Sequence, residues 1–552
     1  KGKTAIVNIT AGSGDYSVSS DNATIATATL SGTVVTITGI ALGNTTVTIK
    51  DNATNQTKTV TVKVTHPNLA IDRSEVEVEK GKTAIVNITA GSGDYSVESN
   101  NTGIATATLS GTVVTITGIA LGNTTVTVKD NATNQTKTVT VKVTTSSIVM
   151  TTSKVVGSTI SIYMYANPAN QPGVWIDLNN NGTMDNGEKV TNFNSITTYT
   201  LGAQTVTIYG KVTTLDCSHN QLTSLNVSNN AELTRLDCPH NPLTSLNVSN
   251  NAELTDLYCH NNQLTSLNVS NNVKLTELSC HGNPLTSLNV SNNAELTRLY
   301  CNDNQLTSLN VSNNAELTNL HCYHNQLTSL NVSNNVKLID LYCQDNQLTS
   351  LNVSNNAVLT ILYCHNNQLT SLNVSNNAVL GELSCFNNQL TSLNVSNNVK
   401  LTRLDCYKNQ LTSLDASNNA ELTTLSCFNN QLTSLNVSNS VKLTRLYCNK
   451  NQLTSLDVSN NVELTDLYCH NNQLTSLIVN SDKKQLKELY CYNNKINKVN
   501  MGALINSMPT HPASDKGKFY PKSTHSGEQN VFDLSHKVAA EAKNWEVYIG
   551  NW

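Results

Sequence analysis

The chain has 552 residues, and at about 100–200 residues per domain this length implies several domains. Its 34 Lys and Arg against 38 Asp and Glu give a formal charge of −4, which excludes the basic surface that nucleic-acid binding requires. No apolar run reaches the ~18–20 residues of a membrane-spanning helix. We therefore expect a modular protein without nucleic-acid partners and without a transmembrane segment.

The first two predicted modules are copies of one another. Residues 1–65 match residues 80–144 at an offset of 79, and only positions 19, 21, 23, 24 and 49 differ. An alternating segment, 66–79, precedes the second copy and is typical of an opening strand. The first copy has no such segment before it. We expect modules at 1–65 and 66–144, the first of them truncated because the chain begins inside it.

Each copy consists of short runs in which apolar and hydroxyl residues alternate, separated by Gly, Asn and Asp turns. Short strands spaced by about 8–12 residues are typical of a two-sheet β-sandwich. The stretch GIALGNTTVTV at Gly118–Val128 and the closing strand Thr138–Val143 resemble the bacterial Ig-like group 2 domain. This resemblance implies a surface or secreted bacterial protein in which such domains act as spacers.

Residues 145–211 are predicted to be strand-rich and to cap the open edge of the segment that follows. They contain DLNNNGTMDNGE, which has the spacing of a calcium-binding loop with ligands at Asp177, Asn179, Asn181, Thr183, Asp185 and Glu188. Because only three of these residues are carboxylates, any calcium site here should be weak, and no cofactor is expected to be required. The alternative is an Asn- and Gly-rich hairpin loop whose side chains cap its own turns.

A second period occupies residues 212–500. All 14 cysteines, from Cys217 to Cys491, are separated by 21 residues, except for a last step of 22. The unit is L-x-x-L-x-C-x-x-N-x-L-T-S-L-N-V-S-N-N, as at 233–251. It resembles the leucine-rich repeat with Cys in place of its third Leu. This resemblance implies a solenoid of 14 turns with a parallel sheet on its concave face.

The repeat is predicted to bury Leu and Cys and to expose the residues between them. Leu236 and Cys238 lie two apart on a short strand and point inward, so Arg235, Asp237 and Pro239 point outward. The Asn three residues after each Cys is expected to hydrogen-bond the backbone of the turn. Equivalent cysteines on parallel strands are about 4.8 Å apart but point the same way, so we expect buried free thiols instead of disulfides. Such a cysteine ladder resembles internalin-type bacterial surface proteins.

The outward strand positions vary from turn to turn, while the LTSLNVSNN segment hardly changes. Exposed aromatic and Arg side chains on rigid strands are typical of a recognition surface. We select as ligand-binding residues Tyr363, Phe386, Arg403, Tyr407, Phe428, Tyr447 and Tyr468. Two alternatives are stacking of these rings on one another, as cross-strand pairs do, and drift at unconstrained exposed positions.

Residues 501–552 are predicted to close the far end of the solenoid. We expect a short helix at MGALINSMP and a second helix that runs into a strand at KVAAEAKNWEVYIGNW, with Trp545 and Trp552 in the core of the cap. No nucleophile and base, paired carboxylates or phosphate loop stands apart from the repeats, so we do not expect an enzyme.

The sequence thus predicts a mainly β chain: two Ig-like β-sandwiches, a β cap, a leucine-rich repeat solenoid and a C-terminal α/β cap. We expect an exported monomer, extracellular or on a bacterial cell surface. Its concave face is expected to bind a host or environmental protein or glycan. The alternative is a structural envelope or stalk protein without a specific ligand.

Overall fold

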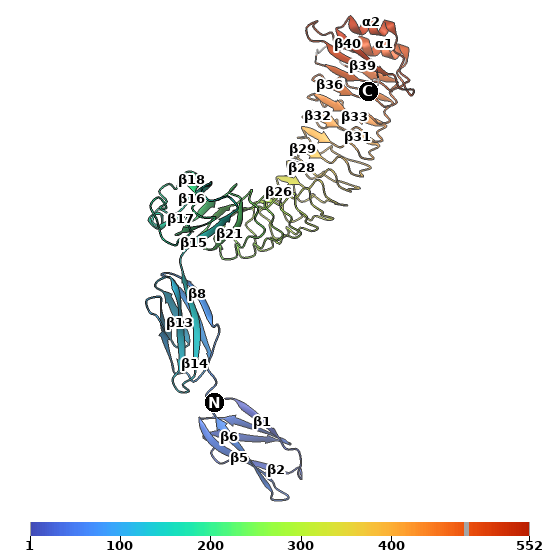
Figure 1. The fold of residues 1–552 in the computed structure, drawn as a ribbon. Helices are drawn as coiled ribbons and strands as arrows, with labels where there is room; N and C mark the ends of the chain where they lie inside the picture. Colours follow the sequence, from blue (N-terminus) through green and yellow to red (C-terminus); the bar gives the residue numbers. More distant parts are fainter. Residues whose placement is uncertain (1, 480–484, 551–552) are drawn as a thin grey trace. The chain divides into compact units, whose positions relative to one another are not determined.

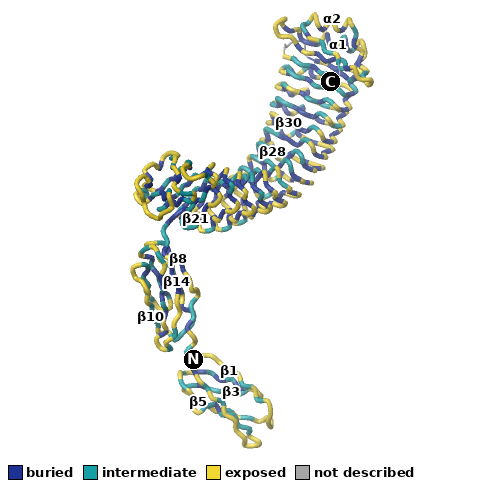
Figure 2. The backbone as a smooth tube through the Cα atoms, viewed as in Figure 1, coloured by how far each residue is buried: buried dark blue, intermediate teal, exposed yellow. Residues whose placement is uncertain are grey.

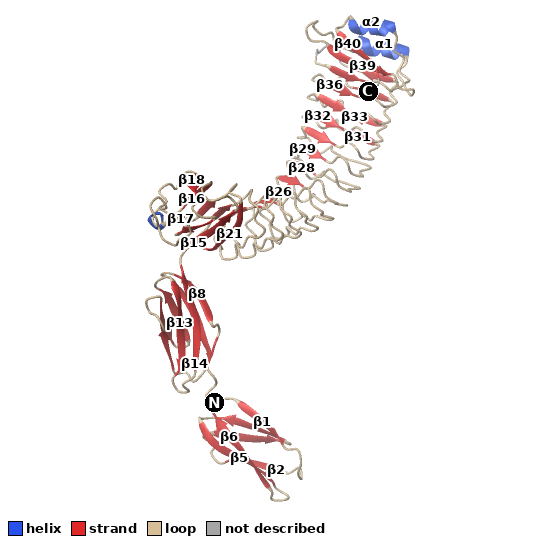
Figure 3. Cartoon of the chain, in the orientation of Figure 1, coloured by secondary structure: helices blue, strands red, loops and turns tan. Residues whose placement is uncertain are grey.

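The computed structural model describes residues 2–479 and 485–550. The chain is mainly β, as the sequence predicts (Figure 3). It divides into two compact units, Lys1–Ser146 and Ser147–Trp552. The first unit holds the two sandwich modules, and the second holds the solenoid with its flanking elements (Figure 1). The finer domain boundaries stay predictions.

The first module is a sandwich of two sheets that pack Val and Ile side chains between them. Among the described residues each sheet has three strands, in the orders β1 (Thr4–Asn8), β4 (Val34–Gly39), β3 (Ala26–Ser31) and β2 (Tyr16–Ser20), β5 (Gly43–Asp51), β6 (Thr57–Val64). The alternation of apolar and hydroxyl residues directs Val35, Ile37 and Val47 into the core.

The second module has the same plan and one more edge strand on each sheet. Its sheets have the orders β11 (Ala105–Ser110), β12 (Val113–Gly118), β9 (Thr83–Ala90), β7 (Ala70–Ile71) and β10 (Tyr95–Ser99), β13 (Gly122–Asp130), β14 (Thr136–Thr144), β8 (Glu75–Glu79). The segment predicted as one opening strand therefore supplies two short strands, one to each sheet. That these sandwiches are bacterial Ig-like domains stays a prediction.

The segment before the repeats pairs with them through two sheets. Its elements are β15 (Ser147–Thr152), β16 (Thr159–Tyr165), η1 (Gln171–Gly173), β17 (Trp175–Asp177), β18 (Thr197–Thr200) and β19 (Thr205–Tyr209). A strand of the first repeat, β21 (Leu222–Asn229), pairs antiparallel with β15, and β16 pairs antiparallel with β20 (Thr214–Asp216). The first strand of the solenoid therefore does not present a free edge.

The repeats form one parallel ladder in which each strand precedes a cysteine (Figure 1). Consecutive strands pair in register, so Leu236 lies beside Leu257, and Leu257 lies beside Leu278. The ladder strands after β20 are β22 (Arg235–Asp237), β23 (Asp256–Tyr258), β24 (Glu277–Ser279), β25 (Arg298–Tyr300), β26 (Asn319–His321), β27 (Asp340–Tyr342), β28 (Ile361–Tyr363), β29 (Glu382–Ser384), β30 (Arg403–Asp405), β32 (Thr424–Ser426), β34 (Arg445–Tyr447), β36 (Asp466–Tyr468) and β38 (Glu488–Tyr490). We call the outward side of this ladder the concave face.

The interior of the solenoid is a column of Leu, Val and Cys side chains, and Figure 2 shows buried residues recurring along its turns. All 14 cysteines are buried and free, which confirms the cysteine ladder. Leu243, Leu246 and Val248 fill the rest of the turn. Short strands on the opposite side are β31 (Ser413–Asp415), β33 (Ser434–Asn436), β35 (Ser455–Asp457) and β37 (Ser476–Ile478).

Two asparagine ladders satisfy the backbone where the turns leave the sheet. As predicted, Asn367 follows Cys364 by three residues; its Nδ2 donates to the Cys343 and Cys364 carbonyls, and its Oδ1 accepts from Leu348 N. The second ladder was not predicted. It is formed by the last Asn of the LTSLNVSNN segment in each repeat. In it Nδ2 donates to two carbonyls of the preceding turn, as Asn377 does to Val353 and Asn356.

The C-terminal cap continues the ladder and covers the core. It consists of α1 (Lys498–Ser507), β39 (Gly517–Ser523), α2 (Leu534–Glu541) and β40 (Trp545–Gly550). Trp545 is buried, as predicted, and its Nε1 donates to the Pro509 carbonyl at 2.9 Å, whereas Trp552 lies outside the described residues. The strand β39 was not predicted. Neither helix in the described part of the chain is long and apolar enough to cross a membrane.

Candidate functional site

Part of the concave face carries a continuous stack of rings on four successive turns. The residue after each Cys there is aromatic: the rings of His365 and Phe386 are 4.1 Å apart, those of Phe386 and Tyr407 4.2 Å, and those of Tyr407 and Phe428 4.3 Å. The last two pairs are parallel to within 10°. This spacing follows from the distance of about 4.8 Å between paired strands. Phe386 and Tyr407 each have a ring on both faces, so their edges are the part open to a ligand.

Beside this stack, the residues that directly precede each Cys form a second column, in which large side chains give way to small ones. Tyr363 and Tyr447 stand in this column, but the three turns between them carry the small side chains Ser384, Asp405 and Ser426. Because these three turns carry no large ring in this column, a recess of about 350 Å³ lies there. Its lining consists of Tyr363, His365, Ser384, Phe386, Arg403, Asp405, Tyr407, Ser426 and Phe428.

The recess has an ion pair on its polar side. Arg403 Nε donates to Asp405 Oδ2 at 2.6 Å, and this hydrogen bond raises the pKa of Arg403. The Asp405 side chain is 7% exposed, whereas that of Arg403 is 57% exposed. The guanidinium is therefore oriented by a buried carboxylate while much of its surface remains available to a ligand.

The end of the recess near Tyr363 is held by hydrogen bonds between turns. The Tyr363 hydroxyl donates to Glu382 Oε2, and burial, together with this carboxylate, raises the pKa of Tyr363. His365 Nδ1 and Ser384 Oγ are 3.0 Å apart, and burial lowers the pKa of His365. This end therefore presents an uncharged imidazole and a fixed phenol at neutral pH.

The structure brings together five of the seven selected ligand-binding residues, namely Tyr363, Phe386, Arg403, Tyr407 and Phe428. The other two, Tyr447 and Tyr468, do not line the recess. Their rings belong to a second stack, in which Tyr468 packs on Tyr490 at 4.2 Å and Tyr490 packs on Tyr520 at 3.9 Å. This second stack extends the concave face into the cap.

The small residues that create the recess were not predicted from the sequence. Ser384, Asp405 and Ser426 carry no motif of their own. Their signal is the interruption of the tyrosine column, which becomes visible once the turns are aligned on their cysteines.

The calcium-like loop follows β17 and is organised by its own carboxylates. Asp177 accepts hydrogen bonds from the backbone N–H groups of Asn181 and Gly182. Glu188 accepts from the backbone N–H groups of Leu178 and Asp185, both at 2.8 Å. These are the hydrogen bonds of a self-capping loop, the alternative interpretation of this segment.

The other predicted ligands of this loop lie close together and exposed. Asn179 Nδ2 and Asn181 Nδ2 donate to Asp185 Oδ2 at 2.7 and 2.8 Å, and Thr183 Oγ1 donates to Asn181 Oδ1 at 2.8 Å. Throughout the described residues, no group of three or more His, Cys, Asp and Glu side chains is placed to hold a metal ion. Calcium binding at this loop stays a prediction.

No model of a known protein family matches the chain, and no curated protein matches it. Several solved structures are similar to the chain, among them the following three. The functional domain of InlJ from Listeria monocytogenes, which includes a cysteine ladder, is 30% identical, with 58% of this chain and 78% of that chain covered and a TM-score of 0.44. The internalin InlF from Listeria monocytogenes is 19% identical, with coverages of 62% and 86% and a TM-score of 0.43. YopM from Yersinia enterocolitica is 23% identical, with coverages of 52% and 59% and a TM-score of 0.41.

Proposed function

We propose that the chain, a leucine-rich repeat solenoid with a cysteine ladder, is an internalin-like adhesion or recognition protein whose concave face binds an extracellular protein or glycan. The recess between Tyr363 and Tyr447 is the observation that carries this proposal. It combines aromatic edges, an oriented guanidinium and a buried carboxylate on strands of one continuous sheet. Rigid aromatic and Arg side chains contribute large contact area at a small loss of side-chain entropy.

The arrangement of the rings supports a protein ligand over a glycan that stacks flat. A sugar platform presents the face of a ring, but the faces of Phe386 and Tyr407 lie against neighbouring rings in the stack. A ligand can therefore contact the ring edges, the Tyr407 hydroxyl and Arg403. These groups suit peptide carbonyls, carboxylates and apolar side chains.

The same stacking supports the alternative of a structural protein without a specific ligand. Rings that pack at 4.1–4.3 Å on consecutive strands stabilise the sheet whether or not anything binds. A variant that removes the rings therefore tests stability and binding together. A variant that fills the recess and keeps the rings tests binding alone.

We further propose an exported protein on a bacterial cell surface, in which the two sandwich modules act as spacers. The buried free thiols are compatible with an oxidising location, because their burial raises their pKa and shields them from oxidants. We expect the chain to be a monomer and to have no catalytic activity.

The test measures binding of the full chain to arrays of extracellular proteins and mucin glycans. The blocking variant is Ser384→Tyr/Ser426→Tyr, which continues the tyrosine column of the neighbouring turns across the recess. The truncating variant is Phe386→Ala/Tyr407→Ala/Phe428→Ala. The matched control is Ser392→Ala/Ser413→Ala/Ser434→Ala, at exposed positions on the other side of nearby turns.

We expect a ligand that both recess variants lose and the control retains, with the melting temperature of the blocking variant unchanged. A ligand that survives the blocking variant would move the site to other turns. Absence of any ligand on both arrays would favour the structural alternative.

A further inference from the structure

The residue directly before the first Leu of each repeat unit forms a row of charged side chains along the solenoid. In the sequence this row lies between the LTSLNVSNN segment and the ladder strand, and from position 232 to position 463 it holds Glu or Lys on ten of twelve turns. Neighbouring turns pair these charges, as Lys274 does with Glu253 at 2.6 Å. Two consecutive turns instead carry Val358 and Val379, which are 47% and 45% exposed. The charged row is therefore interrupted at one place by two exposed apolar side chains.

Two further rows lose their polar residues on the same turns. Two positions after the charged row, ten of twelve turns carry Thr, and the exceptions are Ile339 and Gly381. These Thr hydroxyls donate to the preceding turn, as Thr297 Oγ1 does to the Thr276 carbonyl at 3.0 Å. The next row is the first residue of each ladder strand from β20 to β38, and Ile361 is its only apolar residue. Three rows that are polar on the other turns therefore change together.

The apolar residues of these three rows lie on adjacent turns. In-register pairing places Ile361 beside Asp340 and Glu382, so residues 21 positions apart stand next to one another. The group, which we call the apolar edge patch, spans three turns and consists of Ile339, Val358, Ile361 and Val379. Gly381 adjoins it, and packing does not require a glycine there, because a Cβ built at Gly381 would lie 3.6 Å from the Thr360 carbonyl oxygen.

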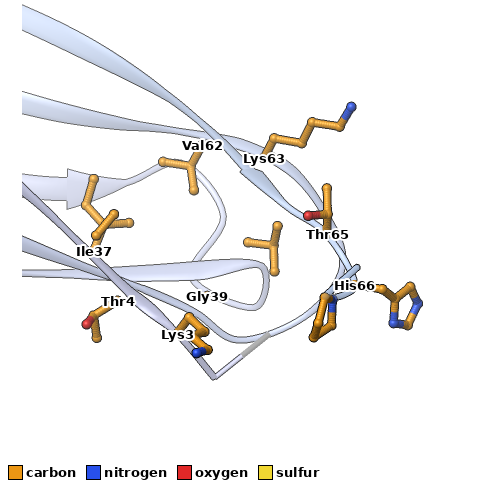
Figure 4. A pocket seen from close by; sticks show the side chains of 11 residues that line it. Lys3, Thr4, Ile37, Gly39, Val62, Lys63, Thr65 and His66 are labelled. Carbon is orange, nitrogen blue, oxygen red and sulfur yellow. The ribbon is translucent and has the colours of Figure 1, made fainter. Parts of the chain in front are cut away.

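The apolar edge patch does not belong to the core of the solenoid. At these turns the core is filled by Leu338, Leu359 and Leu380, and the four patch residues lie outside that cluster. Apolar residues around a hollow can belong to a core, as Ile37 and Val62 do at the groove of about 300 Å³ in the first sandwich module (Figure 4). Single exposed apolar residues are ordinary, but a group of them beside a recess is typical of an interaction surface.

The patch is continuous with the recess on the concave face. Ile361 and Tyr363 lie two residues apart on β28, so their side chains point to the same side of the sheet. Tyr363 lines the recess, and so does Arg403, which stands two turns further along the row of Ile361. Val358 precedes Ile361 by three residues. A ligand in the recess therefore has to extend only past Ile361 to reach the exposed valines.

The carboxylates beside the patch are engaged within the chain. Asp340 accepts a hydrogen bond from Asn319 Nδ2 at 2.7 Å, and Glu382 accepts one from the Tyr363 hydroxyl. These hydrogen bonds hold both acidic side chains against neighbouring turns. A partner with basic groups at these positions would have to compete with them.

The cations beside the patch are more available to a partner. Lys400 follows the two valines in the charged row, and the next member of the row, Glu421, pairs with Lys442 at 2.6 Å. Lys400 therefore has no ion-pair partner in the part of the chain that the structure describes. The Arg403 side chain is 57% exposed although Asp405 orients it. A partner with acidic groups would complement this side of the patch.

We propose that the protein bound at the recess continues over this edge, covers the apolar edge patch with apolar side chains and binds Lys400 and Arg403 with acidic ones. The inference rests on the proposed function and deepens it, because it selects an acidic protein surface over a glycan. Burial of the exposed valines supplies affinity, and the two cations orient the partner.

The test selects random peptides displayed on phage for binding to the full chain. The patch variant is Val358→Glu/Val379→Lys, which continues the charged row across the gap and should leave the melting temperature unchanged. The matched control, Glu253→Lys/Lys274→Glu, reverses an ion pair of the same row on distant turns. We expect the selected peptides to combine acidic and apolar residues. Synthetic copies should bind the patch variant at least about tenfold more weakly than the unaltered chain and the control, and added salt should weaken their binding to the unaltered chain.

Failure to enrich any peptide, or equal binding to the patch variant, would overturn the proposal. The blocking variant of the recess, Ser384→Tyr/Ser426→Tyr, separates this result from failure of the proposed function. Peptides lost in the blocking variant but kept by the patch variant would support the recess and overturn the patch. Peptides lost in the patch variant alone would support the patch and contradict the recess. A mass by light scattering that rises with concentration for the unaltered chain, but not for the patch variant, would assign the patch to a second copy of the chain instead.

Discussion

At the scale of single residues, each repeat contains a position that does not suit most side chains. The second residue after Cys has a positive φ in turn after turn, for example 53° at Lys408 and 56° at Lys450, and Gly282 stands at the same position with 63°. A left-handed conformation costs a residue with a Cβ about 1–2 kcal/mol, less for Asn and nothing for Gly. The repeat therefore tolerates Asn easily and Lys at a cost.

We expect Lys408→Gly to stabilise the solenoid and Lys408→Val to destabilise it. Relief of the left-handed conformation should raise the free energy of unfolding by about 0.5–1 kcal/mol after the entropy loss of Gly, and Val should lower it by about 1–2 kcal/mol. Denaturant unfolding followed by tyrosine fluorescence measures both changes. Lys400→Gly, outside the positive-φ positions, is the control and should only destabilise. Equal effects at Lys400 and Lys408 would contradict this account.

The aromatic column was predictable at this scale, because strand periodicity alone assigns Phe386, Tyr407 and Phe428 to one outward column. Their mutual stacking was an open alternative that the structure confirms. The depth of the recess was not predicted, because it depends on what Ser384 and Asp405 lack. A local sequence pattern predicts which large side chains share a face, but a recess also depends on the small side chains beside them.

At the scale of elements, hydrogen bonds within the loop between β17 and β18 would compete with calcium for the same carboxylates. Its amide and backbone donors already occupy Asp177, Asp185 and Glu188. Calcium would have to replace the donors on Asp185 and Glu188 with its own coordination. Three carboxylates in such a loop are consistent with weak binding.

We expect calcium at millimolar concentration to raise the melting temperature of the second compact unit, Ser147–Trp552, by a few degrees. A ligand that binds only the folded state stabilises it by mass action. Calorimetric titration of the full chain measures the affinity, and magnesium at the same concentration is the ionic control. Asp185→Ala should abolish the effect. Retention of the calcium effect in this variant, or an equal effect of magnesium, would leave the loop as a self-capping turn.

At the scale of the whole molecule, one hydrophobic core extends from Ile148 to Trp545. The 21-residue period predicted this core because every turn repeats the same inward positions. The elements that pair across distant sequence, such as β21 with β15 and β39 with β38, were not predicted. Their pairing is decided by which edges must be covered at the two ends, and a local pattern does not contain that information.

The buried thiols report on the integrity of this core. Burial raises the pKa of Cys280, Cys322 and Cys427 to about 12, so few thiolates form at pH 8. We expect alkylation of the native chain at pH 8 to be at least about 1,000-fold slower than in urea, where all 14 thiols should react. Mass spectrometry counts the modified cysteines.

Leu362→Ala supplies the comparison for this experiment. Loss of this buried side chain should lower the free energy of unfolding by about 2–5 kcal/mol and speed alkylation of Cys343 and Cys364 before that of distant cysteines. Fewer than 14 reactive thiols in urea would show that some cysteines are oxidised, contrary to the ladder of free thiols.

The asparagine ladders also bear on how such a chain can change in length over generations. Each Asn binds carbonyls of the turn before it, as Asn377 does with Val353 and Asn356, and those of the first ladder also bind their own turn, as Asn367 does with Cys364. A gene that gains or loses one repeat unit therefore restores every one of these hydrogen bonds at the new junction. Most such events would be silent, but a unit inserted between Ser384 and Ser426 would divide the recess. Under the proposed function, selection on copy number should therefore act more strongly at these turns than elsewhere in the array.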